Sequence, residues 1–303
     1  MDVLITGVAG FVGSHLSRDL VARGHRVTGT FIGSRPQLPG VELIEVDLLD
    51  PRKLVAVVES ADPDGIVHLA GLSHVGESWR RPDLYFQVNV LGSENLLSAA
   101  RGVRVVLASS AEVYGLVPEE DQPLTEERTL APTSPYGMSK AAMERFAAYH
   151  DATIVRSFNI CGPGQATNFA LPTFAQQLRA IAGDKQSRVI QVGNLSARRD
   201  FIHIDDAVAG YSAVLEQGQP GGVYNLGSGQ AHSIQAALEE LIRISEVSAE
   251  VEVDPERVRK VDVPLLVSST EPLQALGWAA EKTLSEALQD LWEQTAEPGI
   301  PKS

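Results

Sequence analysis

The first 24 residues contain the feature that most restricts the fold of this chain. An apolar, β-branched run at 2–6 leads directly into GVAGFVG at 7–13, and a helical pattern follows from Ser14 to Arg23. Glycines at this spacing permit a tight turn and close backbone approach, and the N-terminus of the helix then faces a pyrophosphate. This order predicts the first unit of a dinucleotide-binding fold, although a purely structural turn can have the same glycines.

Apolar β-branched runs continue to alternate with helical patterns after this unit. The alternation predicts an α/β fold, a doubly wound parallel sheet of the Rossmann type. Strands are expected at 2–6, 26–31, 42–46, 65–70, 103–108 and 153–156, with helices between most of them. After Gly162-Pro163-Gly164 the expected order is a helix at 172–182, a strand at 188–192, a helix at 205–217, a strand at 223–226 and a last helix near 283–295.

The domain organisation follows from the absence of a polar linker in the sequence. Without such a linker, we expect two interleaved parts rather than two separate domains. Residues 1–165, with 200–228 returning to them, are expected to form the dinucleotide-binding Rossmann domain. Residues 166–199 and 229–303 are expected to form a smaller lobe that binds the substrate.

Composition and charge narrow the class of partner. The 303 residues are 44% hydrophobic and 21% charged, which is typical of a globular enzyme. A net charge of −14 argues against nucleic acid or an anionic membrane as partner, since both favour basic surfaces. With one cysteine, Cys161, no signal peptide and no long apolar run, we expect a cytoplasmic protein without an intrachain disulfide. The histidines and the cysteine form no ligand-spaced cluster, so no metal site is expected.

A tyrosine and a lysine one helical turn apart, Tyr136 and Lys140 in SPYGMSK, indicate acid–base chemistry. Residues four apart lie on one face of a helix, so both side chains can reach one substrate atom. A free tyrosine has a pKa of about 10, and a neighbouring ammonium is expected to lower it by stabilising the phenolate. The serines Ser109 and Ser110 offer a hydroxyl nearby in the sequence. Chance also produces such pairs, so the surroundings must distinguish them from an ordinary surface lysine.

Motifs in the same order along nearly the whole chain resemble those of the extended short-chain dehydrogenase/reductases, the NAD-dependent epimerase/dehydratase family that acts on nucleotide sugars. They are the glycine turn, VDLLD at 46–50, HLAG at 68–71, NVLGSENLL at 89–97, SSAEVYG at 109–115, SPYGMSK, FNICGPGQ at 158–165 and RRDFIHIDD at 198–206. Within the family the chain is most similar to members that reduce GDP-4-keto-6-deoxymannose to GDP-rhamnose. That similarity rests on GPGQ followed by NFALPTFAQQL, on VGNLSARRDF and on VDPERVRKVDVP.

The resemblance implies catalytic roles for three hydroxyl and amine groups. Ser110, which stands directly before AEVYG, matches the hydroxyl that holds the developing oxyanion, in preference to Ser109. A cap at the end of a strand is the alternative role of Ser110. Tyr136 matches the acid, and Lys140 matches the group that tunes it and binds the nicotinamide ribose.

Glu112 bears on the choice between reduction and elimination. In the related 4,6-dehydratases a glutamate at this place resembles the base that removes the C5 proton, and a neighbouring acid or hydroxyl helps water to leave C6. Here the neighbour is Ala111, which can neither donate nor accept a proton. The sequence therefore favours a reductase. Glu112 then has either a catalytic role or a hydrogen bond to the substrate or backbone.

The segment from Thr30 to Arg35 predicts the cofactor preference. An acid at the end of the second strand would bind the ribose diol and repel a 2′-phosphate. No acid is present, and Ser34 with Arg35 can accept a phosphate, so NADP(H) is expected, with NAD(H) as the alternative. A solvated loop is the structural alternative for these residues. The residues expected to bind the cofactor are Gly7, Gly10, Phe11, Val12, Gly13, Ser34, Arg35, Asp47, Leu48, Leu69, Ala70, Tyr136 and Lys140.

The resemblance also implies residues for the nucleotide sugar. Arg199 and Arg259 match diphosphate-binding arginines, whose paired donors suit phosphate even in an acidic protein, and Asp262 matches an acid that holds the ribose diol. Surface ion pairs are the alternative for the arginines, and Arg198 is an alternative to Arg199. For His74 the alternative is a packed, hydrogen-bonded side chain. The residues expected to bind the substrate are His74, Ser110, Glu112, Asn159, Asn168, Arg199, Arg259 and Asp262.

Three functions are compatible with these residues. The first is reduction of the C4 carbonyl of GDP-4-keto-6-deoxymannose, and the second is a 4-epimerase or 4,6-dehydratase reaction that returns the hydride to the sugar. The third is a non-catalytic dinucleotide-binding regulator, against which the intact Ser110, Tyr136 and Lys140 argue. Relatives often dimerise through the helix at Lys140 and one at about 84–100. We therefore expect a homodimer, although only 16 positions separate Lys140 from Arg156.

Overall fold

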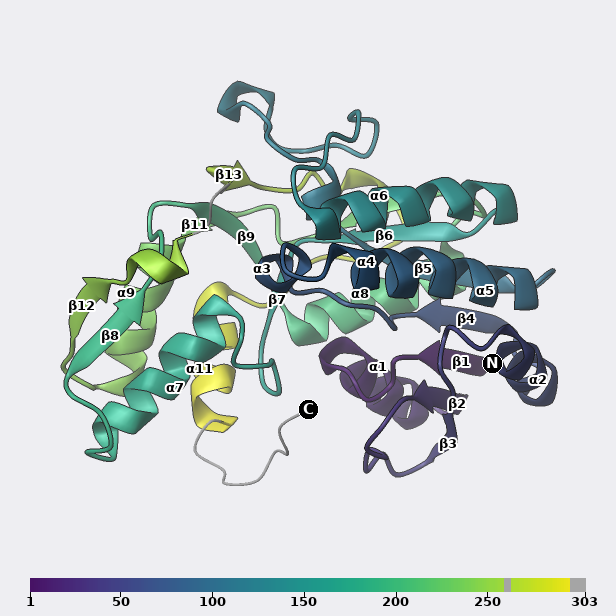
Figure 1. Ribbon diagram of the computed structural model, residues 1–303, viewed down its shortest axis with the longest axis horizontal. Coiled ribbons are helices and arrows are strands. Elements are labelled where there is room, and N and C mark those ends of the chain that lie inside the picture. Colours follow the sequence, from purple (N-terminus) through teal and green to yellow (C-terminus); the bar gives the residue numbers. More distant parts are fainter. Residues whose placement is uncertain (259–262, 295–303) are drawn as a thin grey trace.

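The computed structural model describes residues 1–258 and 263–294. Seven parallel strands form the central sheet of its larger part. These strands are β1 (Asp2–Thr6), β2 (Arg26–Phe31), β3 (Val41–Glu45), β4 (Gly65–His68), β5 (Arg104–Ser110), β6 (Thr153–Ser157) and β10 (Val223–Leu226). Their order across the sheet is β10-β6-β5-β4-β1-β2-β3 (Figure 1). This arrangement confirms the predicted Rossmann-type doubly wound sheet, whose strand order reverses between β1 and β4.

Helices cover both faces of this sheet. One face carries α1 (Phe11–Ala22) and α8 (Ile204–Gln217), and the other carries α2 (Pro51–Ala61), α5 (Gly92–Ala99) and α6 (Pro135–Ala147). Successive side chains of a strand point to opposite faces, so Val3 and Ile5 pack toward α1 and α8 whereas Leu4 packs toward α2 and α5. A strand buried on both faces is apolar throughout, which is why these strands stand out in the sequence.

A smaller lobe lies at the left of Figure 1. It contains α7 (Ala170–Ala182), β8 (Val189–Val192), α9 (Ile234–Ser245), β12 (Glu250–Val253) and α11 (Leu284–Gln294). The Arg179 guanidinium lies 3.4 Å from the centre of the Trp292 ring and donates to the Trp292 carbonyl over 2.7 Å, which holds α11 against α7. The helices predicted at 172–182 and near 283–295 are present, but α9 and β12 were not predicted.

Strand β9 (Arg198–His203) lies outside the seven-stranded sheet. It pairs with β7 (Asn159–Cys161), β11 (Ala231–Ser233) and β13 (Leu265–Leu266), none of which was predicted. Within residues 200–228, α8 packs on the seven-stranded sheet and β10 forms an edge strand of it, whereas β9 pairs outside this sheet. The division into two domains stays a prediction. In the described part of the chain, no helix is both long enough and apolar enough to cross a membrane.

Candidate functional site

The glycine turn after β1 leaves no room for side chains. Gly7 has φ of +73°, and a Cβ there would lie 2.7 Å from Cα of Ala70, in the loop after β4. A Cβ on Gly13 would lie 2.3 Å from the Gly7 carbonyl oxygen. Gly10 is the N-cap of α1 and makes no side-chain cap, so no side chain competes with a ligand for the N–H groups at this end of the helix. A bare backbone turn at the start of a 12-residue helix suits the pyrophosphate of a dinucleotide.

The other residues expected to bind the cofactor follow the carboxyl ends of neighbouring strands. Phe11 and Val12 open α1, Leu69 and Ala70 follow β4, and all four are half-buried. Ser34 and Arg35 follow β2 and are exposed, while Asp47 is exposed and Leu48 buried after β3. Ligands of doubly wound folds bind at this edge of the sheet.

One acid near the predicted 2′-phosphate position was not identified from the sequence. The register of β2 and β3 places Glu45 opposite Phe31, and the Glu45 carboxylate accepts from the Gly33 N–H over 3.4 Å. The Arg35 guanidinium lies on the same loop, 5.9 Å from the centre of the Phe31 ring. The loop after β2 therefore has both a cation, Arg35, and an anion, Glu45, beside it.

Tyr136 occupies the first turn of α6. Ser134 caps this helix, accepting from the Gly137 N–H over 3.0 Å, and Pro135 provides its first residue. The Tyr136 ring is buried, and burial raises the pKa of its phenol well above the ordinary value, opposed by a side-chain hydrogen bond with Ser110. The expected lowered pKa of Tyr136 is therefore wrong, because desolvation of the buried phenol is the largest contribution to its pKa.

Lys140 lies one turn further along α6, on the same side. Its ammonium donates to the Ala108 carbonyl of β5 over 2.7 Å. Burial lowers the pKa of Lys140 from 10.5 to about 8, and the negative charge of Glu144 opposes the change. The side chain is thus mostly charged at neutral pH and directed toward the end of β5.

The two serines of β5 have different partners. Ser109 donates to the Glu144 carboxylate over 2.5 Å, and Glu144 forms a buried ion pair of 2.8 Å with Arg156. Ser110 is the serine that reaches Tyr136, as the resemblance implied. It also accepts from the Glu112 N–H over 3.2 Å, so the alternative role as a strand-end cap is present as well.

Glu112 is close enough to affect the tyrosine. It is half-buried, and its charge contributes to the raised pKa of Tyr136. Ala111, between Ser110 and Glu112, is buried in an apolar cluster with Val113. The methyl group of Ala111 offers no proton to a reaction at this place.

His74 is held by hydrogen bonds at both ring nitrogens. Nδ1 accepts from the Glu77 N–H over 3.0 Å, so Nε2 carries the proton and donates to the Asn168 carbonyl over 3.1 Å. Phe169 packs edge-on against the ring at 5.9 Å between centroids. These contacts agree with the packed, hydrogen-bonded alternative for His74. Asn159 and Asn168 are both exposed.

The two arginines at the start of β9 point in different directions. Arg199 is buried, and its Nη1 donates to the carbonyls of Arg198 (2.9 Å) and Val263 (2.6 Å). Arg198 is half-buried, and its guanidinium forms an ion pair with Glu119. Arg259 and Asp262 lie outside the described residues.

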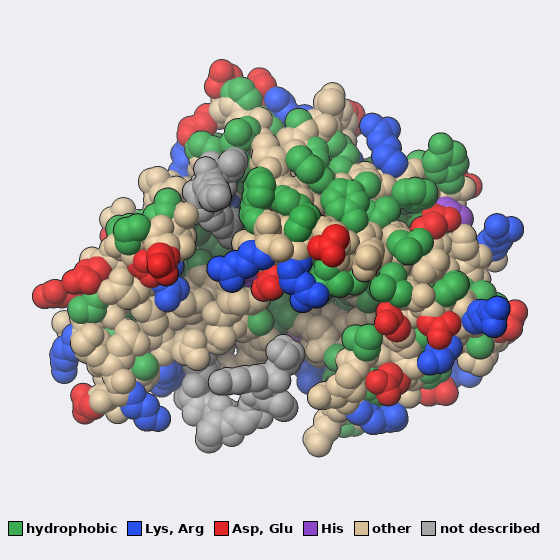
Figure 2. Space-filling view, in the orientation of Figure 1, with side chains coloured by type: hydrophobic (Ala, Val, Ile, Leu, Met, Phe, Trp, Pro, Cys, Tyr) green, Lys and Arg blue, Asp and Glu red, His purple; other side chains and the backbone are tan. Residues whose placement is uncertain are grey.

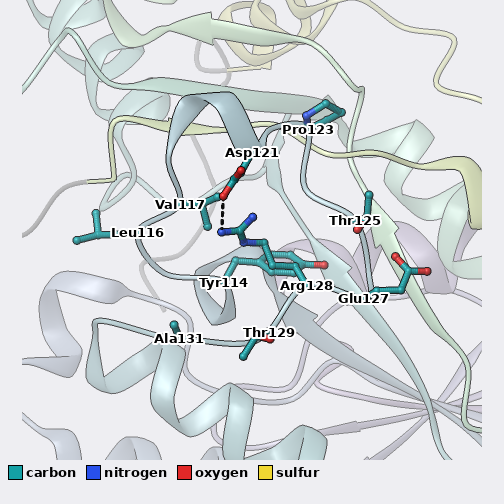
Figure 3. A pocket seen from close by; sticks show the side chains of 10 residues that line it. All are labelled: Tyr114, Leu116, Val117, Asp121, Pro123, Thr125, Glu127, Arg128, Thr129 and Ala131. Atoms are coloured by element: carbon teal, nitrogen blue, oxygen red, sulfur yellow. Dashed lines mark hydrogen bonds and ion pairs between the residues drawn. The ribbon is translucent and has the colours of Figure 1, made fainter.

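A separate pocket of about 580 Å³ lies in the segment between β5 and α6 (Figure 3). An Asp121–Arg128 ion pair of 3.0 Å crosses it. The Tyr114 hydroxyl donates to the Asn225 side-chain oxygen over 2.6 Å. None of the residues predicted for catalysis or binding lines this pocket, which is formed by Tyr114, Leu116, Val117, Asp121, Pro123, Thr125, Glu127, Arg128, Thr129 and Ala131. Among residues 1–258 and 263–294, no group of three or more histidines, cysteines or acids could hold a metal ion.

Comparison with known proteins agrees with this geometry. A family model described as GDP-mannose 4,6 dehydratase matches residues 4–291. The chain belongs to this family. Membership in the GDP-mannose 4,6 dehydratase family confirms the resemblance found in the motifs, and with it an enzyme class of nucleotide-sugar reductases, epimerases and dehydratases.

Three relatives illustrate the range of the family. The chain is 33% identical to a GDP-6-deoxy-D-mannose reductase of Pseudomonas aeruginosa, over 96% of this chain and 97% of the relative. A structure of RMD from Pseudomonas aeruginosa complexed with NADPH has a TM-score of 0.85 and 32% identity, covering 97% of this chain and 98% of that one. A Thermus thermophilus UDP-glucose 4-epimerase in complex with NAD has a TM-score of 0.88 and 30% identity, covering 99% and 100%.

Five buried polar residues behind the site received no role from sequence reasoning. They are Thr6, His68, Ser93, Asn89 and Ser139. Four of them stand in HLAG, NVLGSENLL and SPYGMSK, which served only to establish the resemblance. His68, which ends the apolar strand β4, could have indicated these residues from the sequence, because a buried polar group requires hydrogen-bond partners.

Proposed function

We propose that this protein reduces the C4 carbonyl of GDP-4-keto-6-deoxymannose to give GDP-rhamnose, with NADPH as reductant and NADH as the alternative. The observation that carries the proposal is the pairing of a buried, protonated Tyr136 with Ser110 beside the inert Ala111. Carbonyl reduction needs one proton at the sugar oxygen, whereas elimination also needs a group that helps water to leave. The identity to a GDP-6-deoxy-D-mannose reductase supports the choice of substrate.

In this proposal, the residues of the chain bind the reactants and manage one proton. The glycine turn at Gly7, Gly10 and Gly13 would hold the dinucleotide, whose reduced nicotinamide supplies a hydride when bound. Tyr136 donates its phenolic proton to the sugar O4, and Ser110 donates a hydrogen bond to the same oxygen as charge develops there. Because burial raises the pKa of Tyr136, the phenol is protonated at any ordinary pH and available as the acid.

The reaction is tested by adding GDP-4-keto-6-deoxymannose and NADPH and following the absorbance of the reduced nicotinamide. Consumption of one NADPH per product supports the reductase. Product without net consumption would favour an epimerase, the reaction named for the Thermus thermophilus relative. Tight cofactor binding without any reaction would favour a regulator. Either of these last two results overturns the proposal.

The acid is tested by Tyr136→Phe. Turnover should fall by about 10²–10⁴-fold, the contribution of a general acid, while NADPH affinity stays close to that of the wild type. Tyr149→Phe is the matched control, because Tyr149 is 86% exposed on the surface after α6. Full activity of Tyr136→Phe would show that another group donates the proton.

We also propose that the protein forms a homodimer through α6 and the helical segment beside it. Met138 and Phe146 are exposed on α6, and Phe86 with Leu91 are exposed on the neighbouring segment. Figure 2 shows hydrophobic side chains gathered over this face. Light scattering should give twice the chain mass.

Substitution at this face tests the homodimer. Leu91→Glu should give the mass of a single chain by light scattering, because a charge within an apolar interface opposes association. Val253→Glu, at a residue 61% exposed in the smaller lobe, should leave the mass unchanged. A wild-type protein with the mass of one chain would refute the dimer.

A further inference from the structure

A continuous line of hydrogen bonds passes behind the catalytic residues. It begins at Thr6, the last residue of β1, whose hydroxyl contacts His68 Nδ1 at 2.6 Å. His68 Nε2 contacts the Ser93 hydroxyl at 2.8 Å, and Ser93 donates to the Asn89 carbonyl over 2.7 Å. Thr6, His68, Ser93 and Asn89 are each no more than 2% exposed. Water therefore cannot replace any of these bonds.

The protons in this line can be assigned without ambiguity. Because Ser93 donates to Asn89, its oxygen must accept from His68, which places the imidazole proton on Nε2. His68 Nδ1 then accepts from the Thr6 hydroxyl, and Thr6 in turn accepts from the Ala70 N–H over 3.3 Å. Burial, with a contribution from the charge of Lys140, lowers the pKa of His68 to about 3. The ring is therefore neutral at ordinary pH, and the direction of the bonds is fixed.

Asn89 continues the line toward the catalytic helix. It lies in a π-helical turn, Gln87–Leu91. Its carboxamide accepts from the Leu72 N–H (2.8 Å) and donates to the Leu72 carbonyl (3.0 Å) and to the Ser139 hydroxyl (2.9 Å). Ser139 donates to the Tyr136 carbonyl over 2.7 Å. We call Thr6, His68, Ser93, Asn89 and Ser139 the buried chain.

The two ends of the buried chain contact the two halves of the site. At one end, Ala70 lies against Gly7, where a Cβ would come within 2.7 Å of its backbone. At the other end is the backbone of Tyr136 itself. Between them, a Cβ on Gly71 would lie 2.9 Å from the Asn89 amide oxygen and 3.5 Å from the Lys140 ammonium. A displacement of the loop at residues 70–72 would therefore move both the glycine turn and the pair Tyr136 and Lys140.

We propose that Thr6 and His68 are positioning residues that, through the buried chain, fix the glycine turn relative to Tyr136 and Lys140. Neither touches the reacting atoms. The expected effect on catalysis rests on the proposed function. The link between the glycine turn and Tyr136 requires only that the protein binds NADPH. A fully satisfied polar network of this kind specifies one arrangement, and loss of one member leaves its neighbours unpaired.

Thr6→Val tests this proposal, because it removes the hydroxyl while keeping the shape of the side chain. Thr6→Ser retains the hydroxyl and should behave like the wild type in both measurements below. Thr28→Val is the matched control, since Thr28 is a threonine 6% exposed on the adjacent strand β2, opposite Leu4. Ser93→Ala removes a different hydrogen bond of the buried chain, the one between His68 and Ser93, and must give the same result as Thr6→Val.

The first measurement needs no sugar substrate. The six tyrosines are replaced by fluorotyrosine, and the fluorine resonance of Tyr136 is identified from Tyr136→Phe. NADPH should shift this resonance in the wild type, in Thr6→Ser and in Thr28→Val. The shift should fall to less than half in Thr6→Val and in Ser93→Ala at saturating NADPH. An unchanged shift in both of these variants, whatever their thermal stability, overturns the proposal.

The second measurement follows turnover with GDP-4-keto-6-deoxymannose. Thr6→Val and Ser93→Ala should lose at least tenfold in kcat with little change in KM for the sugar nucleotide, and Thr6→Ser should restore kcat. Unchanged kcat in both variants overturns the positioning role. If the wild type does not reduce the sugar, the proposed function fails, and the fluorine measurement still decides the mechanical link.

Discussion

Replacement of Lys140 by methionine is expected to remove activity and to stabilise the protein at neutral pH. Methionine approximates the length of the buried side chain but carries no charge. Burial lowers the pKa of Lys140 from 10.5 to about 8, so folding at pH 7 brings a charged group into surroundings that disfavour its charge. Removal of the charge removes this penalty.

The size and the sign of the effect follow from proton linkage. The folded-state pKa lies below the unfolded one, so the unfolded chain binds the proton more tightly. The penalty on folding is therefore complete below about pH 8 and disappears as the pH rises toward 10.5. It amounts to about 3 kcal/mol at pH 7 and about 1 kcal/mol at pH 10. The lost hydrogen bond to the Ala108 carbonyl costs about 1–2 kcal/mol at every pH.

Lys140→Met should therefore be about 1–2 kcal/mol more stable than the wild type at pH 7 and about 0–1 kcal/mol less stable than the wild type at pH 10. Urea denaturation of both proteins at the two pH values measures the difference. Lys53→Met is the control, because Lys53 is a surface lysine with 69% of its side chain exposed, and its loss changes the net charge equally. A stability difference that is the same at both pH values would refute the argument from burial.

Three other substitutions test the cofactor crevice. Gly13→Ala should weaken NADPH binding at least tenfold and destabilise the protein by about 1–3 kcal/mol, because its Cβ would lie 2.3 Å from the Gly7 carbonyl oxygen; fluorescence titration and thermal unfolding measure both effects. Arg35→Ala should lower the ratio of kcat/KM for NADPH over NADH by about tenfold, the loss of one charged hydrogen bond to phosphate, and an unchanged ratio would exclude Arg35 as the phosphate ligand. Glu45→Gln should change this ratio in the opposite direction, because it removes an anion that hydrogen-bonds to the Gly33 N–H beside the same position.

The central sheet was predictable because its strands are buried on both faces. The predicted bounds of β1, β2 and β10 agree with the structure, since each is a run of apolar and β-branched residues between clear turns. The two- and three-residue strands β13 and β7 have no periodicity that a sequence can reveal. They form because β9 offers them a partner, which is a property of the folded chain.

Residues of the candidate site could be identified where they stand at the end of a strand or within a motif. They could not be where their properties depend on burial or on strand register. The position of Ser110 before AEVYG was enough to distinguish it from Ser109. The net shift in the pKa of Tyr136 was predicted in the wrong direction, because the burial that raises it cannot be read from the sequence. Glu45 was missed because strand register, rather than distance along the chain, brings it to Gly33.

The position of β10 at the edge of the seven-stranded sheet has a consequence for synthesis. Its partner β6 ends at Ser157, and β10 begins at Val223, 66 positions later. At about 5–20 residues per second, a ribosome needs about 3–13 s to make this stretch. During that time the nascent chain carries β6 with an open edge, the kind of surface on which strands of other chains pair. The yield of folded protein should therefore depend on how quickly translation proceeds between these two strands.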